Sequence, residues 1–158
     1  MFAGIAGIPA IAAQMDPQPA EKAQTRSNEE DPRILSLRRF FQKSGAPAQN
    51  LSEVFVREAD NNGLDWRLLP VLALVESGGG KHCQKHNLFG WKNGQASFAS
   101  FADGIRQVAW FLSNSQLYKN KSIDGVLYTY NHNPLYRRKV KSIMDLLSPT
   151  MEIALATQ

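Results

Sequence analysis

Glu76 is the residue with the clearest potential for chemistry in this chain of 158 residues. It follows an apolar run, residues 68–75 (LLPVLALV), and precedes Ser77 and three glycines. Because an apolar setting disfavours the charged form of a carboxyl group, we expect Glu76 to keep its proton near neutral pH. Such a group can act as a general acid. The alternative is that Glu76 only ends a helix on its solvated side.

A second acid near Glu76 is not evident in the sequence. The segment from Ser77 to Ala102 contains no Asp or Glu, and the next carboxylates are Asp103 and Asp124. Asp103 stands where a helix is expected to begin, so we predict that it is the N-cap. Asp124 falls in the first turn of a short helix, where the helix dipole favours an acid. A pair of carboxylates at one site is therefore not expected from residues close in sequence.

Residues 87–92 (NLFGWK) combine an amide, two aromatic rings and a glycine. Aromatic faces can stack on sugar rings, and an amide such as that of Asn87 matches hydroxyl and acetamido groups. The alternative is that Phe89 and Trp91 cover the core. We expect one of these two rings in each role.

Residues 129–136 (TYNHNPLY) join two expected helices and bring two tyrosines to a turn. Tyr130 could reach the acid, orient a water molecule or stabilise a developing positive charge. Asn131 and Asn133 could instead end one helix and cap the next. Spacing alone does not choose between these roles.

Metal binding is weakly indicated. His82, Cys83 and His86 have the chemistry of zinc ligands, but no fourth ligand is evident nearby. We therefore expect neither a metal nor another cofactor. Cys83 is the one cysteine of the chain, which excludes an intrachain disulfide.

The charge balance bears on the kind of partner. The net charge is +4 and the calculated pI is about 9.3, which favours an anionic partner such as a nucleic acid, a membrane surface or an acidic wall polymer. Arg137, Arg138, Lys139 and Lys141 lie on the polar side of an expected helix and either form a solvated face or help to hold such a polymer. No nucleic-acid-binding motif is recognisable, and no stretch is long and apolar enough to span a membrane.

Four segments are expected along the chain. Residues 1–13 form an apolar segment that resembles part of a secretory signal but lacks the basic start, so it is either an export signal or an apolar tail. Residues 14–30 are polar and without apolar periodicity, which predicts a disordered linker. A domain of residues 31–148 and a tail of residues 149–158 complete the chain. The length suits one domain with a substantial core.

The apolar periodicity predicts a mainly α domain of about six helices. We expect them at residues 32–43, 49–60, 66–77, 101–112, 122–130 and 134–147. Asp65 is expected to cap the third helix, and Pro70 either kinks it or marks its true start. Residues 78–99, with five glycines, predict a small β-hairpin or an irregular loop.

The order of these segments resembles the bacterial glucosaminidase domain, the mannosyl-glycoprotein endo-β-N-acetylglucosaminidase-like family. The segments that carry the resemblance are residues 63–70, 73–78, 87–90, 101–105 and 129–131, followed by Tyr136 and Val140. The resemblance covers about residues 31–148. It implies an α+β lysozyme-like fold, with the small β element beside an active-site cleft, and an enzyme that cuts peptidoglycan.

The resemblance also implies roles for single residues. Glu76 matches the catalytic glutamate and Tyr130 matches the family tyrosine. The expected substrate-binding residues are Ser77, Asn87, Phe89, Trp91, Asn131 and Tyr136. The second acid of some glucosaminidases has no match, and Asn131 after Tyr130 looks more like the Tyr-Asn of lytic transglycosylases.

The expected activity is an endo-β-N-acetylglucosaminidase that acts on β-1,4-linked N-acetylated amino sugars of peptidoglycan, with Glu76 as general acid. The alternatives are a lytic transglycosylase that leaves anhydromuramic ends, or a wall-binding module without catalysis. The expected partners are peptidoglycan glycan strands, with no nucleic acid and no membrane span. We expect a monomer that is exported to the periplasm, the cell wall or the medium.

Overall fold

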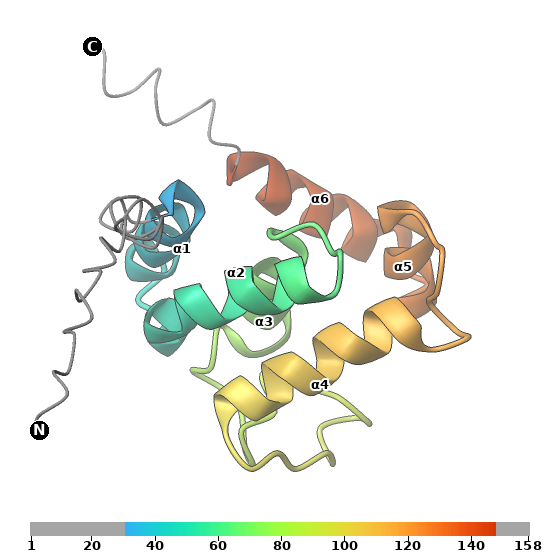
Figure 1. Cartoon of the computed structure of the whole chain (residues 1–158), viewed down its shortest axis with the longest axis horizontal. Coiled ribbons are helices and arrows are strands. Elements are labelled where there is room, and N and C mark those ends of the chain that lie inside the picture. Colours follow the sequence, from blue (N-terminus) through green and yellow to red (C-terminus); the bar gives the residue numbers. More distant parts are fainter. Residues whose placement is uncertain (1–30, 148–158) are drawn as a thin grey trace, which may run out of the picture. The chain divides into compact units, whose positions relative to one another are not determined.

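The computed structural model describes residues 31–147 of the chain. These residues form six α-helices and one short 3-10 helix, and no strand is present among them. Figure 1 shows their arrangement. In chain order the elements are α1 (Pro32–Lys43), η2 (Pro47–Leu51), α2 (Ser52–Asn61), α3 (Leu68–Ser77), α4 (Phe101–Asn114), α5 (Ile123–Tyr130) and α6 (Pro134–Leu146). The prediction of a mainly α domain with about six helices is confirmed.

Side-chain caps explain where four of the helices begin. Asp31 precedes α1, Ser100 precedes α4, Ser122 precedes α5 and Asn133 precedes α6, and each side chain accepts a hydrogen bond from a backbone N–H of the first turn. Such bonds satisfy N–H groups that have no partner within the helix. The cap at Asn133 therefore fixes the start of α6, the helix that carries Tyr136.

Two predicted caps are wrong. Asp103 is not the N-cap of α4: the Ser100 hydroxyl takes that place, and Asp103 lies in the first turn, where its carboxylate accepts from the N–H of Ala99. Asp65 does not cap α3 directly, because its carboxylate accepts from the N–H of Arg67 in the turn before the helix. The spacing between a polar residue and an apolar run does not determine the first residue of a helix to within one or two positions, so the capping residue can differ from the predicted one.

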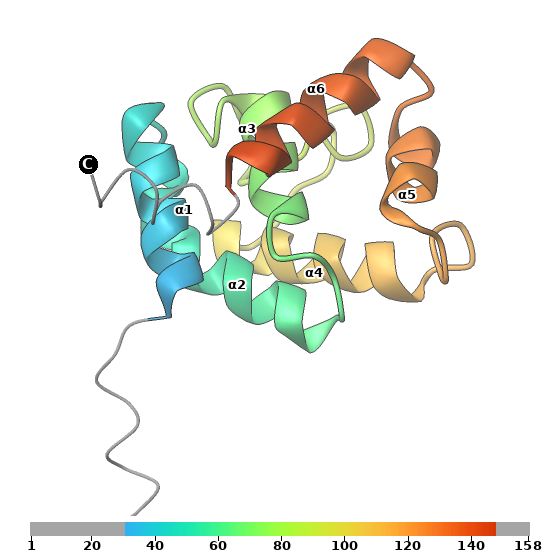
Figure 2. The ribbon, with the colours of Figure 1, turned by 90° about the horizontal axis from the view of Figure 1, so that it is seen from above.

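The helix α3 forms the centre of the domain. All residues from Leu68 to Ala73 are buried, and Figure 2 shows α3 enclosed by α1, α2, α4 and α6. Pro70 is the third residue of α3, so its missing N–H falls among the groups that lack a helical partner, and it marks the start of the helix. At the other end, Gly78 adopts a left-handed conformation (φ 64°) that stops the helix directly after Glu76 and Ser77.

Of the two alternatives expected for residues 78–99, the β-hairpin is wrong and the irregular loop is confirmed, since the segment is an irregular series of turns. Gly90, Lys92, Asn93 and Gly94 all have positive φ angles, whereas a strand requires an extended backbone. The two ends of this loop are joined by a hydrogen bond from the Phe98 N–H to the Lys85 carbonyl and by a contact between the His86 ring and the Phe98 carbonyl. The loop therefore keeps a defined shape without a β-ladder.

The predictions for residues 1–13, 14–30 and 149–158 fall outside the described part of the chain. Within residues 31–147, the longest helix is α4 and no helix combines the length and apolar character needed to cross a membrane.

Candidate active site

Glu76 lies one residue before the end of the central helix, where the polypeptide leaves the core. Its neighbour Ala73, one turn earlier, is fully buried, but Glu76 itself is exposed. The expectation that an apolar setting withdraws this carboxyl group from water is therefore wrong. The helix carries Glu76 to the surface because Gly78 ends it at that point.

The Glu76 carboxylate has a defined orientation. The Tyr136 hydroxyl, from the first turn of α6, donates a hydrogen bond to Glu76 Oε1 over 2.5 Å. Glu76 Oε2 lies against Gly90, whose ideal Cβ position is 3.5 Å from this oxygen. Burial, followed by the hydrogen bond to Glu76, raises the pKa of Tyr136 far above its ordinary value of 10.0, so the phenol stays a donor at neutral pH.

Tyr130 connects the end of α5 to the loop of residues 87–92. Its hydroxyl donates to the Phe89 carbonyl over 2.8 Å. Burial, followed by the negative charge of Glu76, raises the pKa of Tyr130. The rings of Tyr130 and Tyr136 are nearly parallel, with 6.2 Å between centroids. The two tyrosines thus lie together beside the acid, although the Tyr130 hydroxyl is not bonded to it.

Asn87 holds the turn that presents Phe89, Gly90 and Trp91. Its side-chain amide donates to the Trp91 carbonyl over 3.0 Å, and its side-chain oxygen accepts from the Trp91 N–H over 2.9 Å. Asn87 and the Phe89 side chain are buried, whereas Trp91 is partly exposed. Phe89 therefore covers the core, as expected for one of the two rings, and the stacking of Trp91 on a sugar stays a prediction.

A pocket of about 480 Å³ opens next to Glu76, a volume within the usual range of small-molecule sites, about 300–1,000 Å³. Its lining residues are Glu76, Phe89, Gly90, Trp91, Lys92, Asn93, Phe111, Leu117, Tyr118, Tyr130 and Asn131. Trp91 packs edge-on against Phe111, with centroids 5.2 Å apart, and Phe111 packs edge-on against Tyr118 at 5.9 Å. These three aromatic rings therefore pack together along one wall of the pocket.

Glu76 is the sole carboxylate among the residues that line this pocket within the described part of the chain. Asp103 and Asp124 are engaged elsewhere. Asp103 accepts from Arg106 and Gln107, and Asp124 accepts from Lys141 over 2.9 and 3.0 Å. The arrangement thus supplies one acid with a tyrosine donor instead of two facing acids.

The pocket brings together most of the residues that the sequence singled out. Its lining includes Glu76, Phe89, Trp91, Tyr130 and Asn131. Tyr136 supports the pocket through its hydrogen bond to Glu76. The Asn131 side-chain oxygen accepts from the Asn133 N–H, so its amide also orders the turn.

Ser77 is buried and does not line the pocket. Its hydroxyl donates to the Ala73 carbonyl and accepts from the Gly80 N–H. Both bonds hold the end of α3 to the glycine turn.

Sequence reasoning missed Phe111, Leu117 and Tyr118, which complete the pocket. Tyr118 stands in the segment that follows α4 and is buried, which raises the pKa of its phenol. The pair Leu117-Tyr118 in an otherwise polar stretch (SNSQLYKNK) is the signal that could have identified both residues.

The candidate zinc ligands do not converge. Among residues 31–147 no group of three or more His, Cys, Asp and Glu side chains is placed to hold a metal ion. The His86 ring contacts the Phe98 carbonyl, and the Cys83 thiol lies 3.6 Å from the Gly80 carbonyl. These residues therefore hold the loop.

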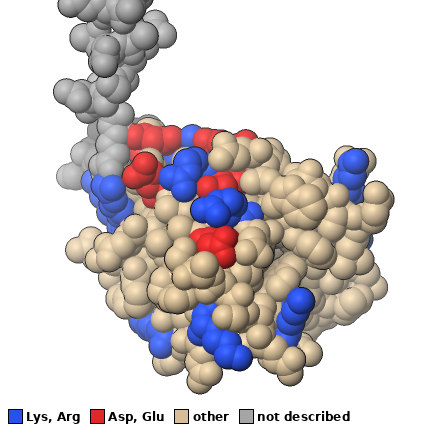
Figure 3. Space-filling model, turned by 60° about the horizontal axis from the view of Figure 1, so that its bottom comes forward, with Lys and Arg blue, Asp and Glu red and all other residues tan. Residues whose placement is uncertain are grey.

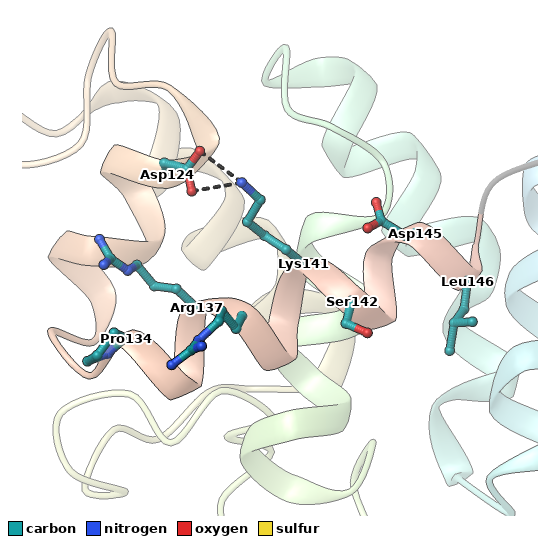
Figure 4. Close-up of a pocket in the computed structure, with 8 residues that line it drawn as sticks. Asp124, Pro134, Arg137, Lys141, Ser142, Asp145 and Leu146 are labelled. Carbon is teal, nitrogen blue, oxygen red and sulfur yellow. Dashed lines mark hydrogen bonds and ion pairs between the residues drawn. The ribbon is translucent and has the colours of Figure 1, made fainter.

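A larger hollow of about 700 Å³ lies between α5 and α6 (Figure 4). Lys141 reaches across it to Asp124, and Arg137 also lines it. Two acids, Asp124 and Asp145, are among its described lining residues, which include neither Glu76 nor an aromatic side chain. Because Asp124 is paired with Lys141 and no described aromatic ring can stack on a ligand there, this hollow is the weaker candidate for chemistry, despite its size.

Charge is unevenly distributed over the face shown in Figure 3. Acidic side chains gather in one area, intermixed with basic ones, while the lower part of this face carries only scattered basic side chains. The positive net charge therefore does not form one uniform basic surface on this side.

Comparison with known proteins identifies a family. Residues 52–148 match the family model described as glucosaminidase, mannosyl-glycoprotein endo-β-N-acetylglucosaminidase. The match spans α2 to α6 and includes every residue that lines the pocket. No match was found among curated proteins or among solved structures. The resemblance seen in the sequence is thereby confirmed, and the chain belongs to the glucosaminidase family.

Proposed function

We propose that this protein is a glycosidase that cleaves peptidoglycan glycan strands with Glu76 as general acid. Family membership supports a glycosidase in general. The observation that carries the proposal is the position of Glu76: it is the one carboxylate among the described residues that line an aromatic pocket, and Tyr136 orients it. An aromatic wall suits a polymer of sugar rings, and a fixed acid suits protonation of a glycosidic oxygen.

The hydrogen bond from Tyr136 gives the two carboxyl oxygens of Glu76 different roles. With Oε1 occupied, Oε2 is the oxygen that can carry a proton toward a substrate next to Gly90. When Glu76 gives up that proton, its carboxylate becomes charged and the Tyr136 bond becomes charge-assisted. The donor is therefore placed where negative charge develops during the reaction.

Cleavage of the bond leaves an oxocarbenium-like sugar, which needs stabilisation. We infer that Tyr130 supplies part of it, because its neutral phenol lies between Trp91 and Tyr136 at the pocket wall. The acetamido group of the substrate can supply the rest, as in substrate-assisted glycosidases. Water then completes a hydrolysis, which gives a new reducing end.

A transglycosylase reaction is the second candidate, and the single acid favours it. In this reaction the 6-hydroxyl of a muramic acid residue attacks the sugar in place of water, and no second protein carboxylate is needed. Asn131, which follows Tyr130 and lines the pocket, is the other residue that supports this alternative.

Mass spectrometry of a digest of purified sacculi tests the proposal. A reducing N-acetylglucosamine end indicates a glucosaminidase, and an anhydromuramic end indicates a transglycosylase. Glu76→Gln protein should release neither product. Sacculi that retain wild-type protein without releasing any soluble fragment would instead indicate a binding module and would refute the catalytic proposal.

The proposed setting follows from the substrate. An enzyme that acts on peptidoglycan has to reach the periplasm, the cell wall or the medium, so we propose that the protein is exported. We further propose that it acts as a monomer, since the Glu76 pocket is built from one chain.

A further inference from the structure

A second hollow adjoins the Glu76 pocket. It has a volume of about 540 Å³ and lies between α4 and the loop of residues 91–98. Trp91, Lys92 and Phe111 line both this hollow and the Glu76 pocket, so the two hollows are neighbours that share these residues as a common wall. A chain-like substrate bound at Glu76 would reach the second hollow by passing over this shared wall.

Trp110 gives this hollow an aromatic platform. It lies on α4, and 58% of its surface is exposed, while its neighbours Val108 and Ala109 are buried. An indole in water exposes a large apolar face and one N–H donor, a combination enriched at binding surfaces. Since helix neighbours three and four residues apart share a face, Trp110, Gln107 and Arg106 present their side chains together.

The polar groups of the hollow are positively charged or neutral. Lys92 and Arg106 line it, and no Asp or Glu is among its described lining residues. Asp103 accepts from Arg106 Nη1 over 3.2 Å and from the Gln107 amide over 2.9 Å, which holds both side chains beside Trp110. The remaining guanidinium donors of Arg106 stay available for a carboxylate.

We propose that this hollow is a distal subsite for the same glycan strand, and that it takes a sugar unit bearing a carboxylate. A ring would stack on Trp110 while its carboxylate is bound by Arg106 and Lys92. This inference rests on the proposed function, since it assumes a glycan at Glu76. It predicts that the enzyme distinguishes long strands from short ones and acidic strands from neutral ones.

The test measures binding to full-length Glu76→Gln protein by isothermal titration calorimetry, so catalysis is not needed. The probes are neutral chitooligosaccharides of two and six units, and peptide-free peptidoglycan oligosaccharides of six units, whose lactyl carboxylates are unsubstituted. Adding Trp110→Ala should weaken both six-unit ligands roughly tenfold, the usual scale for truncating an aromatic anchor, and leave the two-unit ligand unchanged. Adding Arg106→Gln should weaken only the acidic six-unit ligand, and this loss should shrink at high salt.

Matched controls lie outside both hollows. Tyr128→Ala removes another exposed aromatic ring. Arg138→Gln removes another exposed guanidinium, from the hollow between α5 and α6. Neither should change glycan affinity. Unchanged six-unit affinity in Trp110→Ala would overturn the subsite alone. Absence of all glycan binding in Glu76→Gln protein would overturn the proposed function together with the subsite.

Discussion

Replacing Gly90 by alanine tests the geometry around Glu76 with an internal control. Gly90 has φ 59°, and a Cβ added there lies 3.5 Å from Glu76 Oε2. Gly94, in the same loop, has φ 80°, and its Cβ would meet nothing within 4 Å. Both substitutions place a side chain on left-handed backbone, which costs about 1–2 kcal/mol. Only Gly90→Ala also places a methyl group beside the carboxyl oxygen.

The two variants should therefore be alike in stability and different in activity. A cost of 1–2 kcal/mol corresponds to a Tm lower by roughly 4–8 °C in a domain of this size. A glycosidic oxygen must approach the acid to about 2.6–3.2 Å, and a displacement of about 1 Å can cost a hundredfold in rate. We expect Gly90→Ala to lower kcat/KM about 10- to 100-fold relative to Gly94→Ala.

The assay combines thermal melts followed by circular dichroism with the rate at which labelled sacculi release soluble fragments. Equal activity of the two variants at equal Tm would refute the inference that the substrate reaches Glu76 next to Gly90. An equal loss of activity in Gly90→Ala and Gly94→Ala would indicate that activity depends on the shape of the loop and not on the space beside Glu76 Oε2.

Three further predictions concern the tyrosines. Tyr136→Phe removes a hydrogen bond to a carboxylate, an interaction of about 1.5–3 kcal/mol, so kcat should fall at least about tenfold. The control, Tyr128→Phe on the exposed side of α5, should leave kcat unchanged. Tyr130→Phe leaves the Phe89 carbonyl without its donor, and urea unfolding should show a loss of about 1 kcal/mol or more; an unchanged midpoint would contradict this. Burial raises the pKa of both Tyr130 and Tyr136 above 10.0, so these phenols lose their protons at lower pH in the unfolded chain than in the folded one. The contribution of the two protonated phenols to folding stability should therefore be complete below about pH 10 and decline above it. Urea titrations on either side of that pH would detect the decline.

The helices were predictable because their signals are local. Asp31-Pro32 set the start of α1, and the Asn133-Pro134 pair set the start of α6, as an N-cap followed by proline predicts. Asp103 and Asp65 show the limit of such signals. A serine and an aspartate three residues apart can each cap a helix, and only the backbone conformation at Ser100 decides between them.

The loop after α3 was harder to predict because its shape depends on distant partners. Asn87 bonds across the turn to Trp91, Tyr130 bonds to the Phe89 carbonyl from 41 residues away, and the left-handed residues prevent a ladder. A sequence pattern that alternates aromatic residues and glycines fits both a hairpin and these turns.

The candidate acid was predictable from its position, but its environment was not. Apolar neighbours in sequence suggested a buried Glu76, yet the last turn of a helix can project its side chain outward as soon as the helix ends. Tyr136 lies 60 residues away in sequence, and its contact with Glu76 depends on the packing of α6 on α3. Long-range packing of this kind leaves no pattern in a single sequence.

The most direct test of the central claim is the wall-degrading rate of Glu76→Gln protein. Glutamine keeps the size of the side chain and an oxygen that can accept the Tyr136 hydrogen bond, but it cannot donate the acid proton. Glu53→Gln, at an exposed carboxylate on α2, is the control. We predict that Glu76→Gln loses at least about a hundredfold in rate while Glu53→Gln retains full activity. Folded Glu76→Gln protein that degrades sacculi at the wild-type rate would contradict the claim that Glu76 is the general acid.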